Sequence, residues 1–157
     1  MKVKLICVGK TGKAFLEEGE KHYKNRLKHY VSFEMIVLPD VKNAKKLTEE
    51  QIKDKEGELI LNKINSNERI ILLDENGKTF SSTEFADFIQ KQFNQGGHGI
   101  VFVIGGPYGF SEELCKKSYA KVSLSRLTFS HQMVRMFFIE QLYRAMTILK
   151  GEPYHHT

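Results

Sequence analysis

A glycine-rich segment follows the most apolar run of the chain and could form a ligand-binding loop. Residues 100–104 read IVFVI, and the following GGPYGF places glycines at Gly105, Gly106 and Gly109. Glycine lets a ligand approach the backbone, and the amides of such a loop can donate hydrogen bonds to it. The spacing differs from the G-x-G-x-x-G of dinucleotide-binding loops, so a nicotinamide or flavin cofactor is not supported. A tight turn is the alternative, but the position after a buried strand favours a binding loop.

A second segment combines small hydroxyl residues with apolar ones just before the final helix. It consists of Leu124, Ser125, Arg126, Leu127, Thr128 and Phe129, followed by Ser130 and His131. Such a segment could form an apolar slot rimmed by backbone donors and acceptors, which suits a nucleobase. Ser130 is also a natural N-cap for a helix that begins at His131. Helix capping and ligand binding explain the segment about equally well.

The final helix and the tail carry the remaining candidates for catalysis. Glu140 and Arg144 are spaced i,i+4, so they could pair with each other, or Arg144 could hold a phosphate or carboxylate. The helix is apolar around most of its circumference, and we predict that it forms a homodimer interface. The tail GEPYHHT adds Tyr154 and His155. We expect no metal site, because zinc needs three or four ligands and the histidines and cysteines show no such spacing.

The composition is that of a globular protein with a basic surface. Its 24 Lys and Arg residues against 19 Asp and Glu residues give a net charge of +5 and a pI near 9.1. That balance suits a polyanionic partner such as RNA. The most apolar stretch, residues 133–149, is interrupted by charged side chains, so we expect no membrane span. With no signal-peptide pattern, Cys7 and Cys115 are expected to be reduced thiols of a cytoplasmic protein.

Apolar strand patterns alternate with amphipathic helix patterns along the chain, which predicts one α/β domain over residues 1–157 with a mostly parallel sheet. Strands are predicted at residues 2–9, 33–39, 69–73, 100–104 and 121–124, with a turn at 74–77. Helices are predicted at residues 12–30, from Thr48 to about Ile64, after Ser81, after Ser111 and at 131–150. Ligands of open α/β sheets bind at the carboxyl ends of strands, which selects the residues after Leu73, Ile104 and Leu124.

Four motifs together resemble a known family over the whole chain. LICVGK, FVIGGPYGF, SLSRLTFSHQMVR and IEQLYRAMTILKGEPYHH are similar to those of the RlmH-type methyltransferases of the SPOUT superfamily. The resemblance implies an α/β fold with helices on both faces of the sheet and a C-terminal trefoil knot. It also implies a homodimer, S-adenosylmethionine as methyl donor, and N3-methylation of a pseudouridine in 23S ribosomal RNA. Ser130 stands where the family usually has proline, so a hydroxyl cap replaces a rigid turn.

The resemblance also assigns roles to particular residues. The cofactor pocket would comprise Leu73, Gly105, Leu124, Ser125, Arg126, Leu127, Thr128 and Phe129. Arg144, Tyr154 and His155 would bind and orient the target base in an active site completed from the neighbouring subunit. Arg144 is a candidate for stabilising the oxygen anion of the base, and His155 or His131 for removing the N3 proton. Water or simple ionisation of the base are alternatives to a histidine base.

Two other functions are compatible with parts of the sequence. A non-catalytic RNA- or ribosome-binding protein would use the basic charge, including the lysines on the exposed face of the first helix, but leaves the glycine loop unexplained. An enzyme acting on a phosphorylated small molecule would use the Gly105 loop without RNA. Because a chain this small offers little surface for reading RNA, we expect an assembled ribosome rather than naked rRNA as the substrate.

Overall fold

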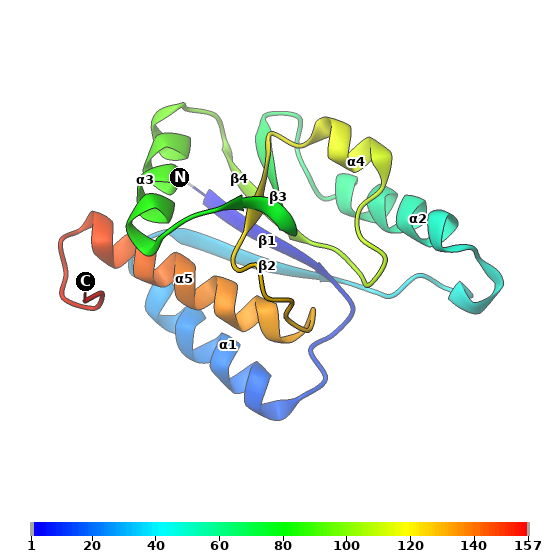
Figure 1. The fold of residues 1–157 in the computed structure, drawn as a ribbon, viewed down its shortest axis with the longest axis horizontal. Coiled ribbons are helices and arrows are strands. Elements are labelled where there is room, and N and C mark those ends of the chain that lie inside the picture. Colours follow the sequence, from blue (N-terminus) through cyan, green and yellow to red (C-terminus); the bar gives the residue numbers. More distant parts are fainter. Residues whose placement is uncertain (1, 157) are drawn as a thin grey trace.

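The computed structural model, which describes residues 2–156, contains a parallel five-stranded sheet flanked by helices (Figure 1). The strands are β1 (Lys2–Val8), β2 (Ser32–Leu38), β3 (Glu68–Thr79), β4 (Gly99–Ile104) and β5 (Ala120–Ser123), in the spatial order β2-β1-β4-β3-β5. The helices are α1 (Ala14–Leu27), α2 (Glu49–Leu61), α3 (Ser82–Asn94), α4 (Glu112–Lys117) and α5 (Met133–Leu149), with a short 3₁₀ helix, η1, at Ala44–Lys46. The α/β class and the parallel sheet are confirmed.

Two hydrophobic cores lie on opposite faces of the sheet. Side chains of successive strand residues point to opposite faces, and β4 shows this clearly. Phe102 packs with Phe138 in the core under α1, α3 and α5, whereas Val101 and Val103 belong to the core under α2 and α4. Every residue of β4 is buried, as its unbroken apolar run predicts. This central strand therefore gives the glycine loop that follows it a rigid base.

Helix starts follow the local signals in the sequence. Thr48 and Ser81 each form a capping box, in which the hydroxyl accepts from the third backbone amide of the helix and the third side chain accepts from the cap residue. Ser111 caps α4 by accepting from the Leu114 amide at 3.2 Å. At the other end of the chain, Gly151 has φ +69°, a left-handed conformation that terminates α5.

The structure corrects several predicted boundaries. Residues 74–77 do not close β3: the strand continues to Thr79, with a register shift against β5 between Leu73 and Lys78. A Cβ on Gly77 would lie 2.7 Å from the backbone of Lys121, so the close approach of β3 to β5 requires glycine at this position. The predicted turn signal marks this irregularity in the ladder.

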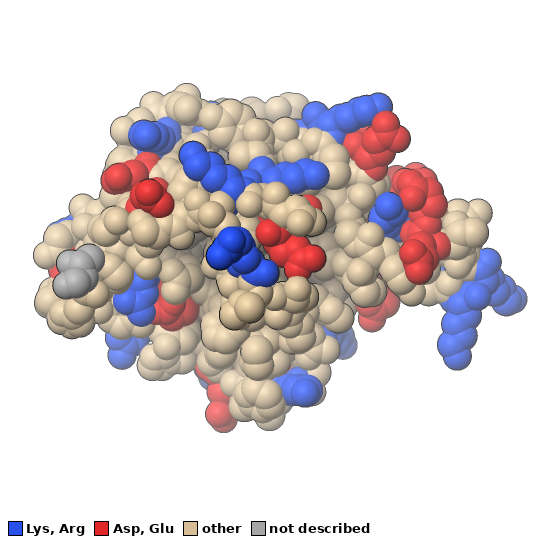
Figure 2. Space-filling model, in the orientation of Figure 1, with Lys and Arg blue, Asp and Glu red and all other residues tan. Residues whose placement is uncertain are grey.

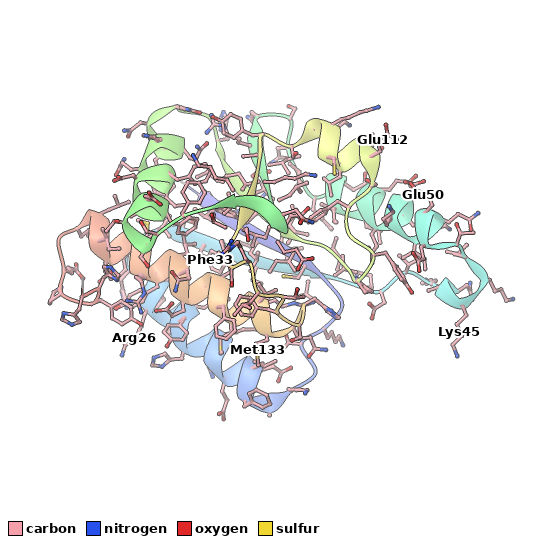
Figure 3. The ribbon with its side chains drawn as sticks, viewed as in Figure 1. Arg26, Phe33, Lys45, Glu50, Glu112 and Met133 are labelled. Carbon is pink, nitrogen blue, oxygen red and sulfur yellow. The ribbon has the colours of Figure 1, made fainter. Side chains whose placement is uncertain are left out.

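The first and last helices also begin later than predicted. α1 begins at Ala14 and not at residue 12. Its first apolar side chain, Phe15, follows the helical spacing that predicts burial, but it is 60% exposed. α5 begins at Met133 rather than His131 (Figure 3), and residues 131–132 form a turn. Gln132, and not Ser130 as predicted, is the N-cap residue of α5, but the Ser130 hydroxyl accepts from the Met133 amide at 3.1 Å and so supports the first turn. Within residues 2–156, no helix is both long and apolar enough to cross a membrane.

Candidate active site

A cavity of about 230 Å³ lies at the carboxyl ends of β4 and β5, beside the point after Leu73 where β3 has left β4 and continues along β5. These are the positions that the sheet rule selects. Of the pocket residues implied by the resemblance, seven line the cavity: Leu73, Gly105, Leu124, Ser125, Leu127, Thr128 and Phe129. Arg126 is exposed and is not among the lining residues. Three segments that lie 14 or more positions apart in the sequence therefore form one pocket.

The pocket combines apolar walls with acidic groups that the sequence did not single out. Ile104, Phe110 and Val134 add to its apolar lining, and Asp74 and Glu75 lie at its β3 side. The carboxylates come from the segment predicted as a turn. The sheet rule selects the position after Leu73, but neither carboxylate was given a role. That β3 continues through them depends on pairing with β5, which no local pattern specifies.

Hydrogen bonds fix the loop between β5 and α5 against the rest of the pocket. The Thr128 hydroxyl donates to Glu75 at 2.6 Å, and the Ser123 hydroxyl donates to the Ser125 carbonyl at 2.7 Å. The Ser125 hydroxyl in turn accepts from the Leu127 amide at 2.9 Å. The hydroxyl residues that suggested a binding slot thus shape its wall.

Glu56 of α2 supports the glycine loop from beneath. A Cβ on Gly106 would lie 2.5 Å from the Glu56 carboxylate, so a side chain at this position would have to displace the end of the Glu56 side chain. Burial raises the pKa of the Glu56 carboxyl, although a hydrogen bond from the Gly106 amide acts in the opposite direction. The other carboxylate oxygen is buried without a partner among the described residues.

A second cluster lies near the C-terminal end of α5. Arg144 donates from Nη2 to Glu140 at 2.7 Å, and its Nη1 is 3.1 Å from His155 Nδ1. The Tyr154 hydroxyl donates to the same Glu140 oxygen at 2.9 Å, and the guanidinium lies 4.7 Å from the centre of the Tyr154 ring. Arg144 therefore pairs with Glu140 and also contacts the tail. Burial and the bond to Glu140 raise the pKa of Tyr154, so its phenol stays protonated.

The predicted catalytic residues do not all meet within one chain. His131 lines the cavity at the start of α5, whereas Arg144, Tyr154 and His155 form the second cluster. His131 and Arg144 are 13 positions apart. At 1.5 Å per helical residue this corresponds to about 20 Å along the axis.

Sequence reasoning did not assign a role to Arg135, which joins α5 to the end of β1. It is 1% exposed and donates to the carbonyls of Val8 at 2.8 Å and Gly9 at 2.7 Å. It also donates to the His131 carbonyl at 3.2 Å, so it fixes the turn from which His131 enters the cavity. An arginine within an otherwise apolar helical stretch was the available signal.

The comparison with protein families identifies this arrangement. The family model described as "Predicted SPOUT methyltransferase" matches residues 1–155. The chain belongs to the SPOUT methyltransferase family.

Similar SPOUT methyltransferases cover the chain almost end to end. Proteins named "Ribosomal RNA large subunit methyltransferase H" from Christiangramia forsetii and Parabacteroides distasonis are 58% and 54% identical to it, each over 99% of both chains. The relative of that name from Cytophaga hutchinsonii is 49% identical over 99% of this chain and the whole of its own. The family resemblance inferred from the four motifs is thereby confirmed.

A solved structure shares the fold at much lower sequence similarity. A methyltransferase from Legionella pneumophila, in complex with the cofactor SAM, matches with a TM-score of 0.50 and 14% identity. The match covers 92% of this SPOUT chain and 66% of the other. Among residues 2–156, no group of three or more His, Cys, Asp or Glu side chains is arranged to hold a metal ion.

Proposed function

We propose that this protein uses S-adenosylmethionine to methylate N3 of a pseudouridine in the 23S rRNA of the large ribosomal subunit. The observation that carries the proposal is the cavity at the ends of β4 and β5 and beside β3, formed by the segments that the family resemblance assigns to the cofactor. Membership of the SPOUT methyltransferases and the names of relatives up to 58% identical support the substrate class.

The cavity is chemically suited to this cofactor. Its apolar walls, formed by side chains such as Leu73, Leu124 and Phe129, can enclose an adenine ring, while backbone groups of the Gly105 loop are available to its edge. S-adenosylmethionine supplies an electrophilic methyl group on a cationic sulfonium. Asp74 and Glu75 place negative charge at the cavity, which favours a bound cation.

Arg144 is the residue best placed to stabilise the target base. When N3 loses its proton, negative charge develops on the neighbouring carbonyl oxygens of the base, and this charge is neutralised when N3 gains the methyl group. Glu140 fixes the guanidinium from one side, and Tyr154 packs against it. A pre-oriented cation of this kind lowers the energy of the anion without reorganising during the reaction.

The contact with Arg144 favours His131 over His155 as the proton acceptor. Arginine has only donors, so Nδ1 of His155 must accept the hydrogen bond and the neutral ring carries its proton on Nε2. His155 then offers a donor at Nε2 to the base, because its acceptor nitrogen is already engaged by Arg144. His131 lies in the cavity wall, and its ring has no hydrogen bond to another residue within 2–156.

We infer that a second copy of the chain completes the site. His131 and Arg144 are about 20 Å apart along α5, and a partner helix packed against α5 could bring one subunit's cavity next to the other's Arg144 cluster. We also propose the C-terminal trefoil knot, on the basis of membership of the SPOUT methyltransferase family. A protein that methylates the assembled ribosome acts in the cytoplasm, and we propose that location for this chain.

The test is transfer of labelled methyl from S-adenosylmethionine to ribosomes that lack the modification. The wild-type chain is compared with Arg144→Ala, with a chain truncated after Gly151, and with Lys21→Ala, which removes one exposed positive charge on α1. We expect label on one pseudouridine, lost in the first two variants and kept in Lys21→Ala. A wild-type chain that binds the cofactor but transfers no label would refute the substrate. If the wild-type chain neither binds the cofactor nor transfers label, a non-catalytic RNA-binding function is the alternative that remains.

A further inference from the structure

We propose that the surface around β5 binds the backbone and one base of the substrate RNA beside the cofactor cavity. This inference rests on the proposed function. The β5 basic surface consists of Arg69, Lys78, Lys91, Lys117, Tyr119 and Lys121.

Two hollows meet at Tyr119. One, of about 410 Å³, lies between the end of β3 and α3 and is lined by Lys78, Lys91 and Tyr119. The other, of about 340 Å³, is lined by Arg69, Lys117 and Tyr119. Lys121 joins the group because its backbone lies against Gly77, next to Lys78. The surface is therefore an indented strip with an aromatic side chain at its centre.

Three of the four lysines on this strip are uncompensated, and the fourth, Lys117, pairs with Glu113 at 3.2 Å. Lys78, Lys91 and Lys121 are exposed, and none has a carboxylate oxygen within 4 Å among the described residues. Two acidic residues, Glu84 and Asp87, also line the larger hollow, and Glu84 accepts a hydrogen bond from the Ser81 amide at 2.7 Å. Phosphates are the natural ligands of exposed lysines spaced along a strip.

Tyr119 is exposed and yet held in place. It is 53% exposed, and the Arg69 guanidinium lies 5.1 Å from its ring centre. Arg69 is itself fixed, because its Nη1 donates to both the backbone and side-chain oxygens of Gln92 at 3.1 Å. A fixed, exposed aromatic ring between lysines is a suitable platform for stacking an unpaired base.

The strip leads directly to the cofactor cavity. β5 ends at Ser123, and five of the next six residues, Leu124–Phe129, line the cavity. Figure 2 shows Lys and Arg side chains across the upper part of this face, between and beside smaller groups of Asp and Glu, in the region of α3 and α4 in Figure 1. An RNA strand that follows β5 would therefore reach the cavity mouth, which favours RNA over an acidic protein as the partner.

The experiment measures binding and methylation of ribosomes with three variants: Lys78→Gln/Lys121→Gln, Tyr119→Leu, and the control Lys45→Gln/Lys46→Gln. The control removes the same charge from exposed residues of η1, at the far end of the molecule (Figure 3). We expect the β5 lysine pair to weaken ribosome binding about tenfold, with a salt dependence shallower by about one to two units of log K per log salt. Tyr119→Leu should weaken it about fivefold or more. Turnover at saturating ribosomes and cofactor affinity should not change.

The outcomes separate this inference from the proposed function. Equal losses in the η1 control would show a net-charge effect and overturn the inference, as would unchanged affinity in the β5 variants. A wild-type chain that binds RNA through this strip but transfers no methyl group would support the strip and refute the reaction. Normal methylation with an unchanged KM in the β5 variants would support the reaction and refute RNA binding by the strip. Binding of an acidic protein, and not of ribosomes, would also overturn the inference.

Discussion

Glu140 organises the cluster at the C-terminal end of α5. One of its oxygens accepts hydrogen bonds from both Arg144 and Tyr154, at 2.7 and 2.9 Å. The Glu140 side chain is 14% exposed, so solvent screens these bonds only partly. The carboxylate thereby determines the orientation of the groups that we assign to base binding.

Replacing this carboxylate by an amide tests that role. We expect Glu140→Gln to lower methyl transfer about tenfold or more, since hydrogen bonds to charged groups contribute about 1.5–3 kcal/mol. The pKa of Tyr154 should fall, because the carboxylate stabilises the protonated phenol and Arg144, left without its partner, favours the tyrosinate. The decrease is measured by ultraviolet titration of tyrosinate, with Tyr154→Phe to assign the signal.

Glu152→Gln is the matched control for that experiment. Glu152 is a carboxylate of the same tail whose partner is the Tyr30 hydroxyl, and it raises the pKa of Tyr30 to about 12. Its replacement should lower the Tyr30 midpoint and leave that of Tyr154 in place. An unchanged Tyr154 midpoint in Glu140→Gln would contradict the arrangement described here.

The two cysteines should differ sharply in reactivity. Cys7 is fully buried in β1, and burial raises the pKa of its thiol to about 12, whereas Cys115 is half-buried. Because the thiolate is the reactive form, we expect a thiol reagent at neutral pH to modify Cys115 and leave Cys7 unmodified until the protein unfolds. Peptide mass spectrometry with and without denaturant checks this. Labelling of Cys7 in the folded protein at the rate of Cys115 would show that β1 opens.

At the level of elements, the irregular join between β3 and β5 is a sensitive point. A Cβ on Gly77 would lie 2.7 Å from the backbone of Lys121, and backbone cannot move aside as a side-chain end can. We expect Gly77→Ala to reduce the free energy of unfolding by about 1–3 kcal/mol and to weaken cofactor binding, because Asp74 and Glu75 line the cavity from the same segment. Denaturant unfolding and calorimetry measure the two effects.

Gly12→Ala is the control for that substitution. Its Cβ would meet only Gln132 at 3.8 Å, an ordinary contact. We expect its unfolding free energy and cofactor affinity to remain close to those of the wild type. Equal behaviour of the two variants would mean that the β3–β5 ladder tolerates a side chain at position 77.

The elements that could be predicted from the sequence are those specified locally. The capping boxes at Thr48 and Ser81 and the glycine after α5 act within one helical turn, and the apolar run of β4 reports its burial on both faces. The continuation of β3 past Leu73 depends on pairing with β5 almost 50 positions later, and no local pattern specifies it. The exposure of Phe15 likewise depends on tertiary structure. Helical spacing shows which residues share an apolar face, but it does not show how much of that face other elements pack against.

The candidate site divides in the same way. Strand order brings Leu73, Gly105 and Leu124 together, so the sheet rule and the family motifs both select the cavity. The support from Glu56 and the attachment by Arg135 depend on contacts between distant elements, and sequence spacing could not specify them.

At the scale of the whole molecule, the separation of the cavity from the Arg144 cluster makes a specific prediction about assembly. If each active site combines one subunit's cavity with its partner's cluster, a chain defective in the cavity and a chain defective in the cluster can complement each other. Gly105→Leu disables the first, since even a Cβ at Gly105 would lie 2.9 Å from the Phe110 ring in the cavity wall. Arg144→Ala disables the second. Each variant alone should be inactive in methyl transfer.

Refolding the two variants together should restore part of the activity. Random pairing makes about half of the dimers mixed, and each mixed dimer has one of its two sites intact, so about a quarter of wild-type activity should return. Mixing without subunit exchange should restore none. Sites contained within single chains would stay inactive in every combination, because each chain lacks one of the two parts. Recovery at the expected level would therefore establish that the cofactor cavity and the base-binding cluster of each active site come from different subunits.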